Sequence, residues 1–333
     1  MQNNKLCEIA DILKKYNNFI ISSHVHLDGD ALGSEMCLYL MLRQLGKDVR
    51  VINQDKTPDI YQFLPCIEEI ECTETLDEEY FFDIKPKTIL VVLDSSNLDR
   101  IGKIHIDIKQ IDFIVNIDHH PSNTLFGKYN YINPHSSSVG EILYGLGKQM
   151  GCILNKQMAI SLYTAIVTDT GSFRYANTKA STFQIALDLV KLGVNPSRVT
   201  DYIYNNNKLS SLKILGEALR KIKIDSFSRI SWTIVTRDML IETKSKDEEI
   251  EGIVDKILSI KKVKVSAFFR ETKDGYIKVS FRSKGEFNVD QFARMFGGGG
   301  HPNAAGCSVK GTIKETTRLI ISKLKTELDN YDN

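Results

Sequence analysis

Three residues that could hold a metal ion stand close together near the start of the chain: His24, Asp28 and Asp30. They follow the apolar run 19–21 and precede the apolar-periodic segment 31–45, a pattern that predicts a buried strand, a tight loop and a helix. Carboxylates that flank a glycine are costly in a core, because each must be desolvated or paired. We therefore expect this loop to bind a cation, although a polar turn with Asp30 as the helix N-cap would also fit the stretch alone.

Further acidic and histidine residues fall where other predicted elements end. They are Asp94 after the apolar run 88–93, Asp118-His119-His120 after the run 113–117, and Asp169 after a helix predicted over 156–167. Continuous apolar runs of this kind are typical of parallel strands that are buried on both faces. Because open α/β sheets bind ligands at the carboxyl ends of their strands, we expect these side chains to converge on one sheet edge.

The ligand chemistry favours a pair of hard divalent ions. Carboxylates mixed with imidazoles suit Mn²⁺ or Mg²⁺ better than the sulfur-rich sites that zinc often prefers. Such a set is too large for one ion that keeps an open position, but it suits two ions about 3.5–4 Å apart. A water between two such ions is deprotonated near neutral pH and can attack phosphorus in line. The residues therefore predict two-metal hydrolysis of a phosphate ester.

The order of predicted elements indicates an α/β fold in two domains. Apolar strands alternate with helices up to the Gly193 and Pro196 stop, which predicts a doubly wound, mostly parallel sheet with helices on both faces over residues 1–195. Residues 196–224 are interpreted as a helical linker, and 225–333 as a smaller α+β domain. The predicted strands of that second domain, which alternate in hydrophobicity as antiparallel strands do, span 230–235, 263–270 and 276–282.

In this order the motifs resemble those of the DHH phosphoesterase family. The matching stretches are Ser23-His24-x-x-x-Asp28-Gly29-Asp30-Ala31-x-Gly33-Ser34, Leu93-Asp94, Asp118-His119-His120 and Thr168-Asp169-Thr170-Gly171. A later stretch resembles the signature of the DHH-associated C-terminal domain, and it reads Phe296-Gly-Gly-Gly-Gly-His301-x-x-Ala304-Ala305-Gly306. The resemblance covers nearly the whole chain. It departs from many relatives at position 27, where Leu stands in place of Pro.

The resemblance implies a role for each of these residues. The implied metal ligands are His24 and Asp28 on one ion, Asp30, His119 and Asp169 on the other, and Asp94 on both. The implied catalytic residues are Asp94 together with His120, which would face the scissile phosphate, and Asp118, which would orient the histidine pair.

The C-terminal part of the chain supplies further substrate-binding candidates. Together with His120, they are Arg282, Gly298, Gly299, Gly300 and His301. The glycine run would let backbone N–H groups approach an anion closely, although a flexible loop would also explain it. An arginine at a strand end can clamp a phosphate, or it can simply be solvated. The aromatic residues directly after Asp169, Phe173 and Tyr175, either stack on a base or belong to the core.

Composition narrows the classes of function. Lys and Arg number 43 against 42 for Asp and Glu, so the chain has no overall positive electrostatic field that would hold a long nucleic acid. The 6 cysteines are scattered without a C-x-x-C pair, which favours reduced thiols in a cytoplasmic protein. No apolar run is long enough to span a membrane, and the P-loop pattern is absent.

The two-domain family members that the chain is similar to are the bacterial nanoRNases. The resemblance therefore implies a Mn-dependent phosphoesterase with two divalent ions, for which Mg²⁺ or Co²⁺ would also be suitable. Its substrates would be short oligoribonucleotides, cleaved to mononucleotides, and pAp, dephosphorylated to AMP. The same motifs allow a soluble cyclic-dinucleotide or pApA phosphodiesterase. The sequence leaves open the preferred substrate, the cleavage polarity and whether a homodimer forms.

Overall fold

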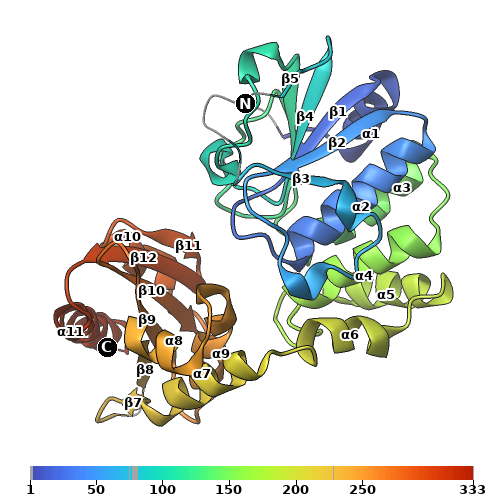
Figure 1. The fold of residues 1–333 in the computed structure, drawn as a ribbon. Helices are drawn as coiled ribbons and strands as arrows, with labels where there is room; N and C mark the ends of the chain where they lie inside the picture. The colour runs from blue at the N-terminus through green and yellow to red at the C-terminus, as the bar shows by residue number, and fades with distance from the viewer. Residues whose placement is uncertain (1–2, 75, 77–81, 228, 333) are drawn as a thin grey trace. The chain divides into compact units, whose positions relative to one another are not determined.

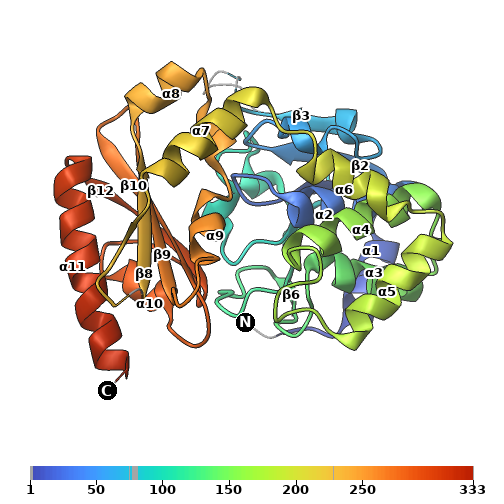
Figure 2. The same ribbon diagram turned by 90° about the horizontal axis from the view of Figure 1, so that it is seen from below.

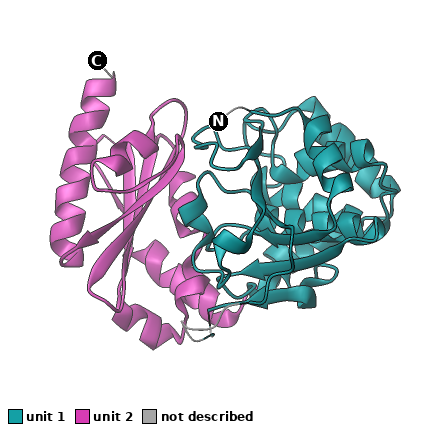
Figure 3. Cartoon of the chain, turned by 90° about the horizontal axis from the view of Figure 1, so that it is seen from above, with its two compact units in different colours: residues 1–206 teal, residues 207–333 magenta. Residues whose placement is uncertain are grey.

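The chain folds into two compact units, residues 1–206 and 207–333, in a computed structural model that describes residues 3–74, 76, 82–227 and 229–332 (Figures 1 and 3). The division falls inside the stretch that the sequence predicted as a linker. That stretch forms two helices, α6 (Pro196–Tyr204) and α7 (Leu209–Arg220). Because Ile214 and Ala218 of α7 are buried in the core of the second unit, α7 is part of that unit rather than a connector.

A parallel six-stranded sheet forms the centre of the first unit, in the order β3-β2-β1-β4-β5-β6. Its strands are β1 (Asn18–Ser22), β2 (Asp48–Asn53), β3 (Ile70–Cys72), β4 (Thr88–Leu93), β5 (Phe113–Asp118) and β6 (Tyr129–Ile132). The chain runs outward from β1 in one direction and from β4 in the other, so the strand order reverses between these two strands. This topology confirms the doubly wound α/β class, and such a switch point is where these folds bind ligands.

The α-helices lie on one side of this sheet (Figure 2). They share one core with alternate strand residues such as Ile21, Val91 and Ile117. They are α1 (Leu6–Lys15), α2 (Gly29–Gln44), α3 (Val139–Met150), α4 (Lys156–Asp169) and α5 (Ala180–Lys191). The other face, with Ile20 and Leu90, is covered by extended chain with Ile104 and Ile106 and by the short 3₁₀ helix Leu98–Ile101. A second 3₁₀ helix, Ile108–Gln110, precedes Ile111, which also belongs to this core. Among the described residues, this face is therefore covered by 3₁₀ turns and not by the α-helices that the sequence predicted on both faces. In segment 101–111, Ile104, Ile106 and Ile108 alternate with polar residues as in extended chain, and β-branched residues favour extended chain.

Two glycines of the first motif allow α2 to approach α4 closely. A Cβ added at Gly33 would lie 2.4 Å from the carbonyl oxygen of Ser161, and one at Gly29 would lie 2.4 Å from the side chain of Thr168. Only a residue without a side chain fits at such contacts. The close helix pair sets Asp30, at the start of α2, beside Asp169, at the end of α4.

The second unit contains a six-stranded mixed sheet in the order β11-β12-β10-β9-β8-β7. Its strands are β7 (Lys223–Ile224), β8 (Ile230–Val235), β9 (Val265–Glu271), β10 (Tyr276–Ser283), β11 (Gly299–His301) and β12 (Ala304–Lys310). One face packs on α7, α8 (Arg237–Thr243) and α9 (Ile253–Leu258), and the other on α10 (Val289–Arg294) and α11 (Ile313–Asp332) (Figure 2).

Strands β8 and β9 pair in parallel, whereas the sequence predicted antiparallel pairing. The segment between them contains α8 and α9, and a crossover of this kind returns the chain in the same direction. Hydrophobic alternation reports one buried face and carries no information on strand direction.

Among the described helices, none combines the length and the apolar character that a membrane span requires.

Candidate metal centre

The predicted metal ligands come together at the carboxyl edge of the first sheet, around the switch point. His24 follows β1, Asp28 and Asp30 lie at the start of α2, Asp94 follows β4, His119 and His120 follow β5, and Asp169 ends α4. The side chains form three groups whose ligand atoms lie within 4.8 Å of one another. Asp94 belongs to two of these groups, and its backbone has a φ of 51°. Such a left-handed conformation is uncommon for a residue other than glycine and often marks a functional site.

The first ligand group joins His24, Asp28 and Asp94. The Nε2 atom of His24 lies 3.4 Å from Oδ2 of Asp94 and 3.8 Å from Oδ2 of Asp28. Nδ1 of the same ring donates to the carbonyl oxygen of Val25 at 2.8 Å, which leaves Nε2 as the atom that faces the acids. Oδ1 of Asp28 accepts two backbone N–H groups and caps α2. The N-cap of α2 is therefore Asp28. The alternative interpretation of this stretch as a polar turn required Asp30 as the N-cap.

The second ligand group joins Asp30, His119 and Asp169. Nε2 of His119 lies 3.7 Å from Oδ2 of Asp169 and 3.8 Å from Oδ2 of Asp30. The carboxylate of Asp30 is fully buried and accepts the N–H groups of Val139 and Gly140, at 2.7 and 3.0 Å, from the first turn of α3. A helix N-terminus favours negative charge, so α3 helps to hold this aspartate in place. Even so, burial and the neighbouring Asp94 raise the pKa of Asp30 well above its ordinary value.

Asp94 stands between the two groups. Its Oδ2 atom faces His24, and its Oδ1 atom lies 3.5 Å from Nε2 of His119. Within the described residues, Oδ1 is buried and accepts no hydrogen bond. This oxygen has the His119 and His120 rings 3.5 Å away but no hydrogen bond, and a buried carboxylate oxygen without a hydrogen bond is costly, by about 1–3 kcal/mol or more, unless a cation or water meets it. The donor set and this orphaned oxygen both fit a pair of divalent ions that share Asp94.

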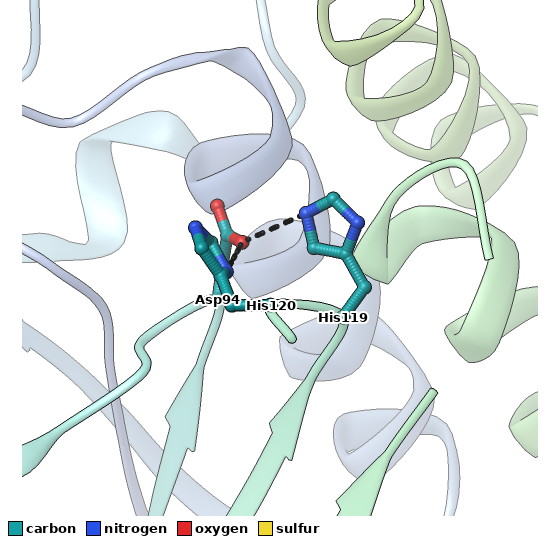
Figure 4. Close-up of side chains that lie close together, drawn as sticks. All are labelled: Asp94, His119 and His120. Carbon is teal, nitrogen blue, oxygen red and sulfur yellow. Dashed lines mark ion pairs between the residues drawn. The ribbon is translucent and has the colours of Figure 1, made fainter. Parts of the chain in front are cut away.

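His120 lies against the same carboxylate but has a separate partner. Its Nδ1 atom is 3.5 Å from Oδ1 of Asp94 (Figure 4). The same atom is 2.7 Å from Oδ1 of Asp118. Asp118 is fully buried, and the same oxygen accepts the backbone N–H of His119 at 2.8 Å. The shorter contact is thus with Asp118, and the orienting role that the resemblance implies for this residue stays a prediction. A direct contact between His120 and a substrate phosphate stays a prediction.

The chain matches known families along most of its length. The model of the DHH family, N-terminal domain, matches residues 18–166, and that of the DHHA1 domain matches residues 234–329. A protein of Thermus thermophilus named bifunctional oligoribonuclease and PAP phosphatase NrnA is 30% identical, over 97% of this chain and 94% of its own length. The chain belongs to the DHH family.

Two further relatives of this DHH protein cover both units. The bifunctional oligoribonuclease and PAP phosphatase NrnA of Bacillus subtilis is 28% identical, over 91% of this chain and 92% of its own length. The crystal structure of an exopolyphosphatase-related protein from Bacteroides fragilis matches with a TM-score of 0.88 at 28% identity, over 98% of this chain and 96% of that one. The family uses divalent metals, which agrees with the ligand groups described above.

Two asparagines that sequence reasoning missed hold the ligand loops of the DHH protein together. Nδ2 of Asn123 donates to Oδ2 of Asp118 at 2.6 Å and to the carbonyl oxygen of Ser95 at 3.1 Å, which ties the loop after β5 to the loop after β4. Nδ2 of Asn177 donates to the backbone oxygen of Asp169 at 3.1 Å. A polar residue in a loop has no periodicity that predicts its hydrogen-bond partners. In the sequence, only the closeness of Asn123 to His120 along the chain indicated that Asn123 lies near the site.

The buried acids and histidines hold one another far from their ordinary pKa values. Burial opposes the charged form of His24, but Asp94 and Asp28 raise its pKa to about 9. Burial, reinforced by the charges of Asp94 and Asp28, raises the pKa of Asp169 to about 7. Against its own burial, Asp94 has its pKa lowered by His119 and His24. Divalent cations would replace the protons that this cluster otherwise retains.

The glycine run of the second unit lies in a tight hairpin. The N–H of Gly298 donates to the carbonyl oxygen of Ala293 at 3.0 Å, and that of Gly300 donates to Oδ1 of Asp290 at 2.8 Å. A Cβ at Gly298 would lie 2.1 Å from the carbonyl oxygen of Gly306, so close packing explains why glycine is needed there. The predicted nest of available N–H groups is therefore wrong for Gly298 and Gly300. Substrate binding by the glycine run stays a prediction.

Arg282 and His301 lie on the same face of the second sheet. Both pair with Ala304, Arg282 from β10 and His301 from β11, and residues directly opposite each other on neighbouring strands share a face. The small side chain of Ala304 therefore stands between them. Nε of Arg282 lies 3.2 Å from Oδ1 of Asp255, with a third of the arginine side chain exposed.

We expect Asp94→Asn to bind fewer metal ions than any other single-ligand variant. Its two oxygens face different ligand groups, so one substitution weakens both, whereas Asp28→Asn affects one. Metal equivalents would be measured by titration calorimetry and elemental analysis of protein loaded with Mn²⁺. Asp99→Asn, an exposed acid on the loop after β4, serves as the control and should bind as the unaltered protein does. Equal stoichiometry in Asp94→Asn and Asp28→Asn would count against a shared ligand.

The stabilisation that metal provides should increase with pH. In the metal-free protein, His24 contributes stability that is fully present below its unfolded value of 6.5 and is lost as pH rises through about 9. The raised pKa of Asp169 gives stability that is present below 3.8 and is lost as pH rises through about 7. Deprotonated ligands bind metal more tightly, so the increase in Tm with Mn²⁺ should grow from about pH 6 to 8.5.

Melting curves of chelator-treated and Mn²⁺-loaded protein across that pH range would measure this effect. A metal-dependent increase in Tm that stays constant with pH would show that these two groups do not exchange protons for the ions.

Proposed function

We propose that this DHH protein is a two-metal phosphohydrolase that degrades short oligoribonucleotides to mononucleotides and removes the 3′-phosphate of pAp to give AMP. The observation that carries the proposal is the pair of ligand groups on either side of Asp94, which suits two divalent ions. The names of the Thermus thermophilus and Bacillus subtilis relatives support this choice of substrates.

The proposal assigns distinct tasks to the ions and to the side chains. When bound, two divalent ions supply an activated water and neutralise the charge that develops on phosphorus. Mn²⁺ suits the mixture of carboxylate and imidazole ligands best, and Mg²⁺ or Co²⁺ would also be suitable. His120, set by Asp118, faces the scissile phosphate and stabilises the same charge.

The proposed substrates are short, and the proposed location is the cytoplasm. A chain with 43 basic and 42 acidic residues offers no continuous positive field for the many phosphate contacts that a long nucleic acid needs. A substrate with one or a few phosphates instead requires a local phosphate-binding site. We assign that site to Arg282 and His301, which flank Ala304 on one face of the second sheet. In this assignment they bind the phosphate of the substrate that does not react.

A side-by-side product assay tests this function. Chelated protein supplied with Mn²⁺ would be given pAp, an RNA of about five nucleotides, pApA, cyclic di-AMP and pyrophosphate. We expect AMP from pAp and mononucleotides from the RNA, and we expect chelation to abolish both. Asp94→Asn purified in the same way controls for contaminating nucleases. A clear preference for cyclic di-AMP would favour the alternative phosphodiesterase, and hydrolysis of pyrophosphate alone would contradict the proposal.

Loss of this phosphate-binding site should raise KM for pAp without lowering the amount of bound metal. Each charge-assisted contact is worth about 1.5–3 kcal/mol, so Arg282→Ala and His301→Ala should each lower kcat/KM on pAp by roughly ten- to a hundredfold. Lys278→Ala, an exposed cation on the same strand as Arg282, is the matched control and should have little effect. An aryl phosphodiester without a second phosphate should be hydrolysed nearly normally by both variants. An equal loss on the two substrates would place Arg282 and His301 in the chemistry instead.

A further inference from the structure

The segment that follows Asp169 is held in an unusual conformation. Gly171, Ser172 and Phe173 have φ values of 54°, 61° and 63°, three consecutive residues in the left-handed region. Side chains other than glycine rarely adopt this conformation, so the turn must be held by its surroundings. The N–H of Ser172 donates to the carbonyl oxygen of Val167 at 2.7 Å, and that of Phe173 donates to Oγ1 of Thr170 at 3.1 Å.

The same segment returns to the metal ligand from which it starts. Nδ2 of Asn177 lies 3.3 Å from Oδ2 of Asp169 and donates to the carbonyl oxygen of Ser137 at 2.9 Å. Residues 170–177 therefore form a short loop that is attached to Asp169 at both ends. Side chains on this loop are held close to the metal centre.

The two aromatic rings of the loop have different surroundings. Phe173 stacks on Phe183 with ring centroids 5.3 Å apart and packs against the core of the first unit. Tyr175 has an exposed fraction of 50%. Its ring lies against the backbone of Gly171, where an added Cβ would come within 2.4 Å of the ring. The sequence allowed either base stacking or a core role for these aromatics, and in the structure Phe173 is partly buried against the core whereas Tyr175 lies at the surface.

We propose that Tyr175 is a platform on which a nucleobase of the substrate stacks. Gly171, which supports the ring, lies two residues after Asp169, a separation of at most about 7 Å between Cα atoms. We infer from this short separation that the ring lies near the ligand group of Asp30, His119 and Asp169, where the reacting phosphate of a nucleotide would lie. The inference rests on the proposed function and names the part of the substrate that the first unit recognises.

The chemistry of stacking matches the substrates proposed for this protein. Every base has a flat π-face, so an aromatic platform binds a nucleotide without selecting its sequence. A protein that degrades short RNA to mononucleotides must accept all bases, and with few phosphates available it needs an apolar contact as well. One stacked base contributes roughly five- to a hundredfold in affinity. The rival role for Tyr175 is structural, as a cover for the backbone of Gly171.

Three variants separate the two roles. Tyr175→Phe keeps the aromatic ring, Tyr175→Leu keeps apolar bulk over Gly171 without a π-face, and Tyr175→Ala removes both. They would be compared on pAp and on its base-free analogue, 1-deoxyribose 3,5-bisphosphate. Tyr204→Ala, which alters a tyrosine of α6 with an exposed fraction of 40%, is the matched control.

We expect Tyr175→Ala and Tyr175→Leu to raise KM for pAp by roughly five- to a hundredfold, and Tyr175→Phe to stay within about twofold of the unaltered protein. All variants should bind the same number of Mn²⁺ ions and hydrolyse the base-free analogue equally. Equal losses on pAp and the base-free analogue, or normal values for Tyr175→Leu, would overturn the platform.

A binding measurement distinguishes failure of this inference from failure of the proposed function. Calorimetric titration of the Mn²⁺-loaded protein with pAp gives an affinity even without turnover. If pAp binds but is not hydrolysed, the proposed function fails, and the platform is judged by whether Tyr175→Leu weakens that affinity by the expected factor. If the unaltered protein does not bind pAp, the platform is overturned together with the function.

Discussion

The structure depends on burying more negative charge than its own side chains neutralise. Asp30 and Asp94 are almost completely excluded from solvent, and His24, beside them, is 6% exposed. Carboxylates in such an environment either keep their protons or require a counter-charge, because desolvation penalises the ionised form. Two observations reflect this constraint: the pKa of Asp30 is raised, and Oδ1 of Asp94 is buried without a hydrogen bond from the described residues. A pair of divalent cations satisfies it, so metal binding and the stability of this sheet edge are coupled.

Close packing and asparagine side chains hold the ligand loops in register. Gly29 and Gly33 bring α2 against α4, and the resulting contact sets Asp30 beside Asp169 in the second ligand group. Asn53 accepts the backbone N–H of Ser23 at 3.2 Å and donates to buried Glu35 at 2.9 Å, so the loop after β1 is fixed to β2 and α2. Asparagine suits these positions because one side chain both donates and accepts. Asn123 has the same function between the loops after β4 and β5.

The proposed modes of substrate recognition share one physical logic. A chain of nearly zero net charge has no overall electrostatic field that would hold a long polyanion, so the proposal places the affinity in contacts to one nucleotide. In this proposal, metal ions bind the reacting phosphate, and Arg282 with His301 binds a second anionic group. Stacking on Tyr175 adds apolar affinity that does not depend on the base. These contacts are few, and together they favour small nucleotides with a terminal phosphate.

What the sequence determined by itself is the convergence of the candidate metal ligands and the central sheet that supports them. Ligand residues placed directly after apolar runs must meet, because parallel strands align their carboxyl ends, and the strands at 88–93 and 230–235 were predicted to the residue. Only the tertiary structure decided which face the α-helices cover, the parallel pairing of β8 with β9, the use of Asp28 as the helix cap, and the hydrogen bonds that occupy Gly298 and Gly300. The helix-covered face and the strand pairing depend on contacts between residues far apart in the chain, and the cap depends on a choice between neighbouring acids. The two glycine N–H groups are occupied because the chain after α10 folds back on that helix. Local pattern carries no information on such contacts, because it records burial and propensity but not the partner.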